Sequence, residues 1–229
     1  MSKAACIKFY EQHSIATEFE FLEVPLSMSL RSSYKYIAPF YDIFVTRATA
    51  SLRQRSLLRL PQQGAVQVLI SGAGTGLDFP YLPLNHCYTS LDLTAAMQQR
   101  SRARVQNLDM TLVQGDSMVL PFENACFDYV VLHLIVAVVP NSDRCLAEAA
   151  RVLKPGGKIL IIDKFLQRGQ RAWLRRGLSV ITAKFATRLN VVFEDLLLST
   201  PELQVVSDEP ALAGGWFRLI ELRKKNIDE

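Results

Sequence analysis

From residue 66 onward, short runs of apolar residues alternate with longer segments of mixed polarity. Nearly continuous apolar runs are typical of strands buried on both faces, and they occur at residues 66–71, 88–93, 110–114, 127–134 and 158–163. Between them, residues 95–105 and 143–153 have helical patterns. Residues 203–207 and 216–223 predict two further strands, paired as a terminal hairpin. The alternation therefore predicts an α/β fold with a mainly parallel sheet covered by helices on both faces.

The two ends of this pattern differ from its middle. Residues 1–30 have no sustained period and predict an N-terminal extension, helical near Ile7–His13, ahead of one domain over residues 31–229. Residues 169–189 place leucine, isoleucine and phenylalanine on one face of a helix, with Trp173 and basic residues beside it. We expect a basic helical cap at about residues 165–200, inserted after the fifth strand.

The composition is that of an ordinary globular domain, with 49% hydrophobic and 21% charged residues. No apolar run approaches the ~20 residues that span a bilayer. The acidic residues Glu18, Glu20 and Glu23 stand where a signal peptide requires an apolar stretch. The sequence therefore predicts a cytoplasmic protein.

The four cysteines are scattered, without a CxxC pair or a nearby histidine cluster. This spacing argues against a disulfide framework and against a structural zinc site. We expect buried neutral thiols and no bound metal. The cysteines are Cys6, Cys87, Cys126 and Cys145.

The net charge is only +4, but two stretches contain basic residues and no acid. Residues 43–77 contain four arginines (Arg47, Arg53, Arg55 and Arg59), and residues 164–193 contain seven basic residues. Such stretches indicate an anionic partner or, alternatively, a solvated basic face. Because the second stretch also contains Trp173 and an apolar face, it predicts peripheral contact with an anionic membrane.

A glycine-rich loop follows the first predicted strand, in the segment Leu69-Ile70-Ser71-Gly72-Ala73-Gly74-Thr75-Gly76. Glycines between a strand and a helix let the backbone approach a ligand closely, with backbone N–H groups facing it. The dinucleotide fingerprint GxGxxG requires a glycine at position 77, where this chain has Leu77. The loop therefore predicts a cofactor other than a dinucleotide.

Acidic residues end the next two predicted strands. Asp92 lies about 20 residues past the loop, where Rossmann folds place an acid that accepts the ribose hydroxyls. Gly115-Asp116-Ser117 ends the third strand, and Leu153-Lys154-Pro155-Gly156-Gly157 precedes the fifth. In this order and spacing, the loop, the two acids and the turn resemble the class I S-adenosylmethionine-dependent methyltransferases over residues 31–229.

Within that class, four segments are similar to bacterial phosphatidylethanolamine N-methyltransferases and to ubiquinone/menaquinone methyltransferases. They are residues 34–42 (YKYIAPFYD), 120–122 (LPF), 138–140 (VVP) and 215–220 (GWFRLI). The resemblance implies a Rossmann-like three-layer sandwich with sheet order 3-2-1-4-5-7-6 and strand 7 antiparallel. It also implies S-adenosylmethionine as the cofactor, over the C-terminal ends of strands 1 to 3.

The cofactor-binding residues implied by the resemblance are Gly72, Gly74, Gly76, Asp92, Leu93, Asp116, Ser117, Tyr34 and His133. One position departs from the family pattern, because Ile70 stands where the family usually has an acid that helps to hold the methionine end. This departure motivates the alternative of a cofactor-binding accessory protein without methyl transfer.

Methyl transfer from a sulfonium needs mainly the alignment of a nucleophile and the removal of its proton. The catalytic candidates are His133, as the base after the fourth strand, and Tyr34 and Tyr41, with Tyr36 beside them. Tyrosine hydroxyls orient an amine, and aromatic rings stabilise the sulfonium. The alternatives are a histidine satisfied at a strand end and tyrosines that pack an N-terminal helix. We interpret Asp163 as a helix-capping or loop residue.

The sequence therefore favours methyl transfer to a lipophilic acceptor, with a phospholipid amine preferred. A quinone or another small molecule is the second choice, and Trp216 and Phe217 suit the pocket for either. The basic stretches raise nucleic-acid modification as a further class. After the fourth strand, however, the chain reads His133-Leu134-Ile135-Val136 in place of a base-flipping motif such as Asn-Pro-Pro-Tyr. We therefore expect no nucleic-acid partner.

Overall fold

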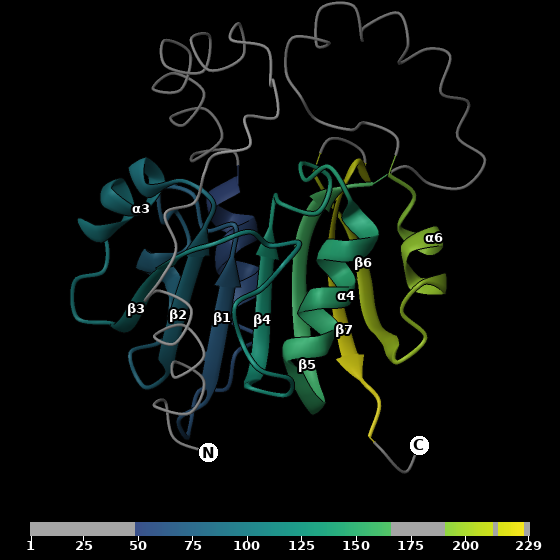
Figure 1. The fold of residues 1–229 in the computed structure, drawn as a ribbon, viewed down its shortest axis with the longest axis horizontal. Coiled ribbons are helices and arrows are strands. Elements are labelled where there is room, and N and C mark those ends of the chain that lie inside the picture. The colour runs from purple at the N-terminus through teal and green to yellow at the C-terminus, as the bar shows by residue number, and fades with distance from the viewer. Residues whose placement is uncertain (1–48, 166–190, 213–214, 227–229) are drawn as a thin grey trace, which may run out of the picture.

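The computed structural model describes residues 49–165, 191–212 and 215–226. These residues form one sheet of seven strands in the order β3-β2-β1-β4-β5-β7-β6, with helices packed against it (Figure 1). Strand β7 is antiparallel to both of its neighbours, and the other pairs are parallel. The predicted fold class and strand order are confirmed. The strands are β1 (Gln67–Ser71), β2 (Cys87–Asp92), β3 (Asp109–Gln114), β4 (Phe127–His133), β5 (Leu153–Lys164), β6 (Leu203–Leu212) and β7 (Phe217–Lys224).

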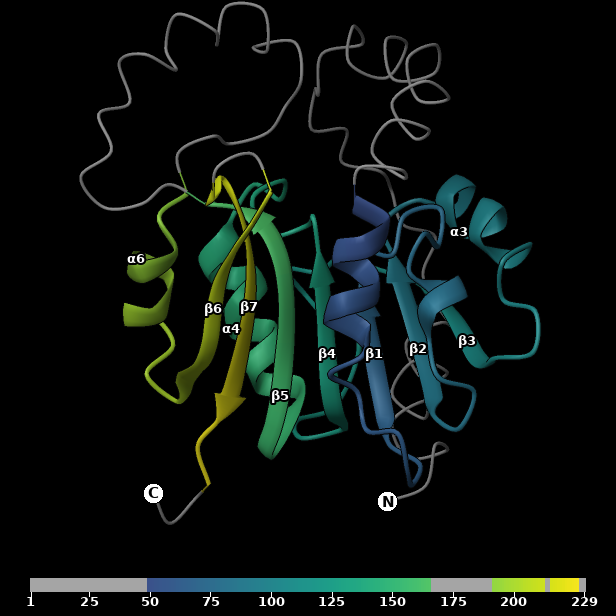
Figure 2. The ribbon, with the colours of Figure 1, turned by 180° about the vertical axis from the view of Figure 1, so that it is seen from behind.

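Helices cover both faces of the sheet. Helix α4 (Ser142–Val152) lies on the face seen in Figure 1, with α6 (Phe193–Leu198) beside it. The helical residues 49–57 cross the opposite face (Figure 2), and α3 (Ala95–Arg102) lies at the β2–β3 side of the sheet. Each face of the sheet packs its own cluster of buried apolar side chains. The result is the three-layer arrangement expected from the alternation of strands and helices.

The boundaries of the elements follow from local chemistry. Thr94 and Asn141 cap α3 and α4, because their side-chain oxygens accept the N–H groups of Met97 and Arg144. Strand β5 begins directly after α4, five residues earlier than the expected start at residue 158. Leu153 already pairs with Phe127, and the next pair is Tyr129 with Lys158, so the proline and glycines form an irregularity in β5 opposite Asp128. The Pro-Gly-Gly turn therefore lies inside the strand.

The prediction of buried thiols is confirmed for two cysteines, and that of a neutral thiol for Cys145. Cys126 and Cys145 are buried, Cys87 is partly buried, and none of the three forms a disulfide. Burial raises the pKa of the Cys145 thiol to about 12, so this thiol stays protonated at neutral pH. Cys6 lies outside the described residues.

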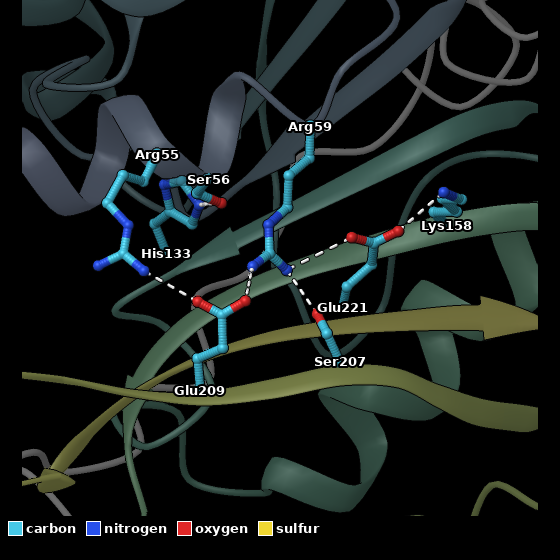
Figure 3. Close-up of polar contacts among 8 residues, drawn as sticks. All are labelled: Arg55, Ser56, Arg59, His133, Lys158, Ser207, Glu209 and Glu221. Carbon is cyan, nitrogen blue, oxygen red and sulfur yellow. Dashed lines mark hydrogen bonds and ion pairs between the residues drawn. The ribbon is translucent and has the colours of Figure 1, made fainter.

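The first basic stretch has its counter-charges elsewhere in the chain. Arg55 and Arg59 approach Glu209 of β6 to within 2.8 and 2.7 Å, and Arg59 also lies 3.3 Å from Glu221 of β7 (Figure 3). Arg53 pairs with Asp78 at 2.8 Å. Folding thus brings carboxylates from distant segments to these three arginines. An anionic partner for the stretch stays a prediction. The ion pairs of Arg55 and Arg59 attach this helical segment to the C-terminal hairpin, and that of Arg53 attaches it to the segment after the glycine-rich loop.

Several expectations concern residues outside the described ranges. They are the extension with its helix at Ile7–His13, the tyrosines Tyr34, Tyr36 and Tyr41, and most of the cap at about residues 165–200. In the described part of the chain, no helix has the length and apolar character needed to cross a membrane.

Candidate functional site

The glycine-rich loop is attached to the end of β2 by backbone hydrogen bonds. The N–H groups of Gly72 and Ala73 donate to the carbonyl of Leu91 over 2.9 and 3.0 Å. The next amide, that of Gly74, donates to Oδ2 of Asp92 over 2.8 Å. The loop and the predicted ribose-binding acid thus lie in contact at the C-terminal edge of the sheet, where ligands bind in open α/β folds.

Gly72 and Gly74 differ in the space that a side chain would have at each position. Both have positive φ, +73° at Gly72 and +55° at Gly74. A Cβ atom on Gly72 would lie 2.5 Å from Cγ1 of Ile135, so this glycine lets the loop pack against the segment after β4. A Cβ atom on Gly74 would meet no atom within 4 Å. The loop therefore has an open side at Gly74, directly next to the Asp92 carboxylate.

The carboxylate of Asp92 keeps acceptor capacity despite its present contacts. Its Oδ1 accepts the backbone N–H and the hydroxyl of Thr94, and its Oδ2 accepts the N–H of Gly74. A carboxylate has about four lone-pair positions, so further donors such as ribose hydroxyls can be accommodated. Leu93, the next residue, is 65% exposed and suits contact with a planar ring.

The end of β3 joins the same cluster. The N–H of Gly115 donates to the carbonyl of Asp92, and the hydroxyl of Ser71 donates to that of Ser117 over 2.8 Å. Oδ1 of Asp116 accepts the N–H of Met118. Within the described ranges its Oδ2 has no hydrogen-bond partner and remains available to a donor such as an aromatic amine. The predicted residues of three strand ends are therefore gathered at one place.

An unsatisfied atom in the loop supports a ligand at this place. Oγ1 of Thr75 is buried and has no hydrogen-bond partner in the described part of the protein. Buried polar atoms are rarely left unpaired, because this costs about 1–3 kcal/mol each. An orphaned hydroxyl, an open glycine and two carboxylates with free acceptor positions fit the hydroxyl and amino groups of an adenosine-containing cofactor such as S-adenosylmethionine.

His133, the last residue of β4, lies in a buried polar network. Its Nδ1 is 2.7 Å from Oδ1 of Asp78, and its Nε2 is 2.9 Å from Oγ of Ser56. Asp78 Oδ1 also accepts a hydrogen bond from Nη1 of Arg53 over 2.8 Å. The His133 side chain is only 1% exposed. Both ring nitrogens therefore have partners inside the protein, and Figure 3 shows Ser56 against the imidazole.

Asp78 is the charged centre of this network. Burial by itself would raise its pKa, but the adjacent His133 and Arg53 outweigh burial and hold the pKa well below its usual value. Asp78 is therefore ionised at any physiological pH. Sequence reasoning missed the residues Arg53, Ser56 and Asp78. One signal was present, because Asp78 is the first acid after the acid-free stretch and lies two residues past Gly76.

Asp163 lies inside β5, which corrects its interpretation as a helix-capping or loop residue. Its Oδ2 accepts the N–H of Ala137 over 3.0 Å, and its Oδ1 accepts the N–H of Lys164 over 2.8 Å. The carboxylate thus holds the segment after β4, which packs against the glycine loop. Burial raises the pKa of Asp163 to about 6, against the opposing effect of these two amides.

Ile70 is an ordinary core residue in this structure. It is 1% exposed and belongs to an apolar cluster that includes Leu57, Phe79, Val131 and Leu160. The side chain at this position is therefore enclosed by hydrocarbon, and no described cation forms part of that cluster.

Comparison with known sequences gives one domain family and two groups of relatives. Residues 69–161 match the family described as "Methyltransferase domain". A phosphatidylethanolamine N-methyltransferase of Cereibacter sphaeroides is 29% identical over 198 residues, which cover 84% of this chain and 96% of that protein. A demethylmenaquinone methyltransferase of Listeria monocytogenes is 38% identical over 143 residues, which cover 57% of this chain and 60% of that protein. This chain thus matches little more than half of the quinone enzyme.

Solved structures share the fold at low sequence identity. An S-adenosylmethionine-dependent methyltransferase of Thermotoga maritima has a TM-score of 0.61 at 19% identity, covering 84% of this chain and 98% of that one. The cyclase SpnF has a TM-score of 0.66 at 16% identity, covering 85% of this chain and 94% of that one. Because a cyclase shares the architecture, the fold by itself does not identify the reaction.

Proposed function

We propose that this chain, which belongs to the class I S-adenosylmethionine-dependent methyltransferases, transfers a methyl group to the amine of a phospholipid. Its methyl donor is S-adenosylmethionine. The observation that carries the choice of acceptor is the extent of the alignments. The phosphatidylethanolamine N-methyltransferase aligns over 84% of this chain, whereas the quinone enzyme aligns over 57%.

In this proposal the ends of β1, β2 and β3 hold the cofactor. Asp92 accepts hydrogen bonds from the ribose hydroxyls, and Asp116 accepts one from the adenine amino group. The cofactor lies against the open side of the loop at Gly74. When bound, S-adenosylmethionine supplies a methyl group already activated by its sulfonium. The remaining work of the protein is to align the acceptor nitrogen and exclude water.

An ammonium group has to lose a proton before its nitrogen can attack. His133 is our candidate for the base, and Nε2 is the nitrogen that would accept the proton. Ser56 now forms a hydrogen bond with Nε2. The role as a base therefore requires Nε2 to exchange this hydrogen bond for one with the acceptor. The ionised Asp78 on Nδ1 would then stabilise the protonated imidazole.

The acceptor resides in a bilayer, so the proposal includes peripheral contact with an anionic membrane surface from the cytoplasmic side. It is supported by the seven basic residues from Lys164 to Phe193 together with Trp173. Each cation near an anionic leaflet contributes about 1 kcal/mol. Pelleting with anionic vesicles should exceed pelleting with zwitterionic vesicles and should decrease with salt. Exchange of Arg171, Arg175 and Arg176 for glutamate should weaken pelleting and leave cofactor binding intact.

The direct experiment is incubation with S-adenosylmethionine labelled in its methyl group and a total lipid extract. We expect the label in methylated derivatives of phosphatidylethanolamine, separated by thin-layer chromatography. Label in a quinone fraction alone would replace the phospholipid by the second candidate, which is supported by the 38% identity to the demethylmenaquinone methyltransferase. A Gly74→Val variant, whose side chain would fill the open side of the loop, is the negative control.

A further inference from the structure

Lys164 occupies an unusual position at the ligand-binding edge of the sheet. It is the last residue of β5 and pairs with Phe217, the first residue of β7. Its Nζ lies 5.8 Å from the ring centroid of Trp216 and 5.5 Å from that of Phe217. All three side chains are partly buried. An ammonium group is therefore held over two aromatic rings, an arrangement that is favourable through the cation–π interaction.

Lys164 differs from comparable cations because no described carboxylate forms an ion pair with its ammonium. Arg59, Arg151 and Lys158 are also partly buried, and each pairs with a carboxylate. Among the described residues, no carboxylate oxygen lies within ion-pair distance of Lys164 Nζ. The adjacent Asp163 directs its oxygens to two backbone amides, so its charge acts on Lys164 only from beyond contact distance. Because a partly buried charge gains from a counter-charge in direct contact, this position suits an anion that a ligand supplies.

The position of Lys164 assigns that anion to the acceptor. The candidate cofactor residues end β1, β2 and β3, whereas β5 is separated from β1 by β4. Since neighbouring strands are about 4.8 Å apart, Lys164 lies roughly 10 Å away from the glycine loop along the sheet. The faces of the two rings are already occupied by the lysine, so a second cation such as the acceptor amine would be repelled there. An anionic group of the acceptor is the chemistry that fits.

We propose that Lys164 binds the phosphate group of the lipid acceptor, with Trp216 and Phe217 holding its ammonium in place. The rings also offer apolar surface to the glycerol and the first acyl carbons, a contact that suits tryptophan. This inference rests on the proposed function and specifies what the acceptor site recognises. A quinone carries no phosphate, so the same feature separates the two candidate acceptors.

The kinetic test uses the full-length chain with short-chain phosphatidylethanolamine. Lys164→Met keeps an apolar stem over the rings and removes the charge. We expect KM for the lipid to rise at least tenfold, kcat to change little and the Kd of the cofactor to stay the same. Lys164→Arg should restore most of the affinity. Lys154→Met is the matched control, because Lys154 lies in the same strand at the opposite edge and pairs with Asp128.

A binding measurement keeps the inference testable without turnover. Calorimetry compares dihexanoyl phosphatidic acid, dihexanoylglycerol and inorganic phosphate. We expect the anionic lipid to bind tightest, with its advantage over the neutral lipid lost in Lys164→Met. Equal affinity for the two lipids, or an advantage that survives in Lys164→Met, overturns the inference. Binding of inorganic phosphate as tight as that of the anionic lipid overturns the lipid assignment. Lys164-dependent lipid binding without methylation of phosphatidylethanolamine overturns the proposed function alone.

Discussion

His133 and Asp78 share a hydrogen bond of 2.7 Å between the imidazole Nδ1 and the carboxylate Oδ1, in a region where neither side chain is more than 3% exposed. This bond joins the end of β4 to the segment after the glycine loop. Arg53 forms a buried ion pair with the same oxygen and thereby connects the helix through residues 49–57 to this network. Three segments that border the candidate cofactor site are therefore held by one carboxylate.

Asp78→Asn should lower the free energy of unfolding by about 3–5 kcal/mol, because it leaves the buried guanidinium of Arg53 without a counter-charge. Urea denaturation followed by circular dichroism measures this. The comparison variant is Glu209→Gln, which breaks ion pairs at a carboxylate that is 43% exposed. We expect a loss of at most about 1 kcal/mol there. Similar losses in the two variants would contradict the central role of Asp78.

As a base, His133 should control the pH dependence of turnover. His133→Gln should remove the acidic limb of the kcat–pH profile and lower kcat by about 10²- to 10⁴-fold. Ser56→Ala leaves the imidazole in place and removes its partner at Nε2, so it should retain the acidic limb. An unchanged pH profile in His133→Gln, accompanied by a lower free energy of unfolding, would assign the histidine a purely positioning role.

Asp92→Ala should weaken S-adenosylmethionine binding by about 1.5–3 kcal/mol, since it removes hydrogen bonds to a charged acceptor. Isothermal calorimetry measures the change, and thermal unfolding verifies that the variant is folded. NAD should not compete for the site, because Leu77 replaces the third dinucleotide glycine. A variant that binds the cofactor like the unaltered protein would disprove the assignment of Asp92.

Ile70→Asp should destabilise the protein by about 3 kcal/mol or more without tightening cofactor binding. Position 70 is enclosed by apolar side chains, and a carboxylate there would be buried without a partner. Ile70→Val, which removes one methylene group, should cost only about 0.5–1.5 kcal/mol. Chemical denaturation and calorimetry test both variants. Tighter cofactor binding in Ile70→Asp would instead indicate that the carboxylate reaches the methionine ammonium.

Asp163 should make the free energy of unfolding fall as the pH rises from about 4 to about 6. In the unfolded chain an aspartate has a pKa of about 3.9. In the folded protein burial raises the pKa of Asp163 to about 6, so the folded state binds the proton more tightly. The stability that protonated Asp163 contributes is complete below its pKa in the unfolded chain. It is lost as the pH rises through its pKa in the folded protein.

Two pKa units correspond to about 3 kcal/mol. The Asp163→Asn variant lacks this titration, so the difference in stability between the unaltered protein and Asp163→Asn should shrink by up to that amount between pH 4 and pH 7. Denaturation curves at a series of pH values measure the difference, in which the other titrating groups cancel. Parallel pH dependences of the two proteins would contradict the raised pKa.

The sequence by itself determined the architecture and pointed to the strand ends that form the candidate cofactor site. Apolar runs separated by helical patterns specify a parallel sheet, because strands buried on both faces have no polar side. Gly72, Gly74, Asp92 and Asp116 could be chosen as candidates because each lies at or shortly after the end of a predicted strand. The C-terminal ends of parallel strands lie at the same edge of the sheet, so residues that follow different strands in the sequence lie close together in space.

The tertiary structure alone decided the partners of charged and buried groups. Arg55 and Arg59 pair with Glu209, about 150 positions later in the chain, and no local pattern encodes such a contact. For the same reason, the sequence did not connect Asp78 with Arg53 and His133. Lys164 lies over Phe217 because β7 runs antiparallel to β5 and returns its first residues to the ligand edge. Pairings of this kind depend on which distant segments the sheet places side by side.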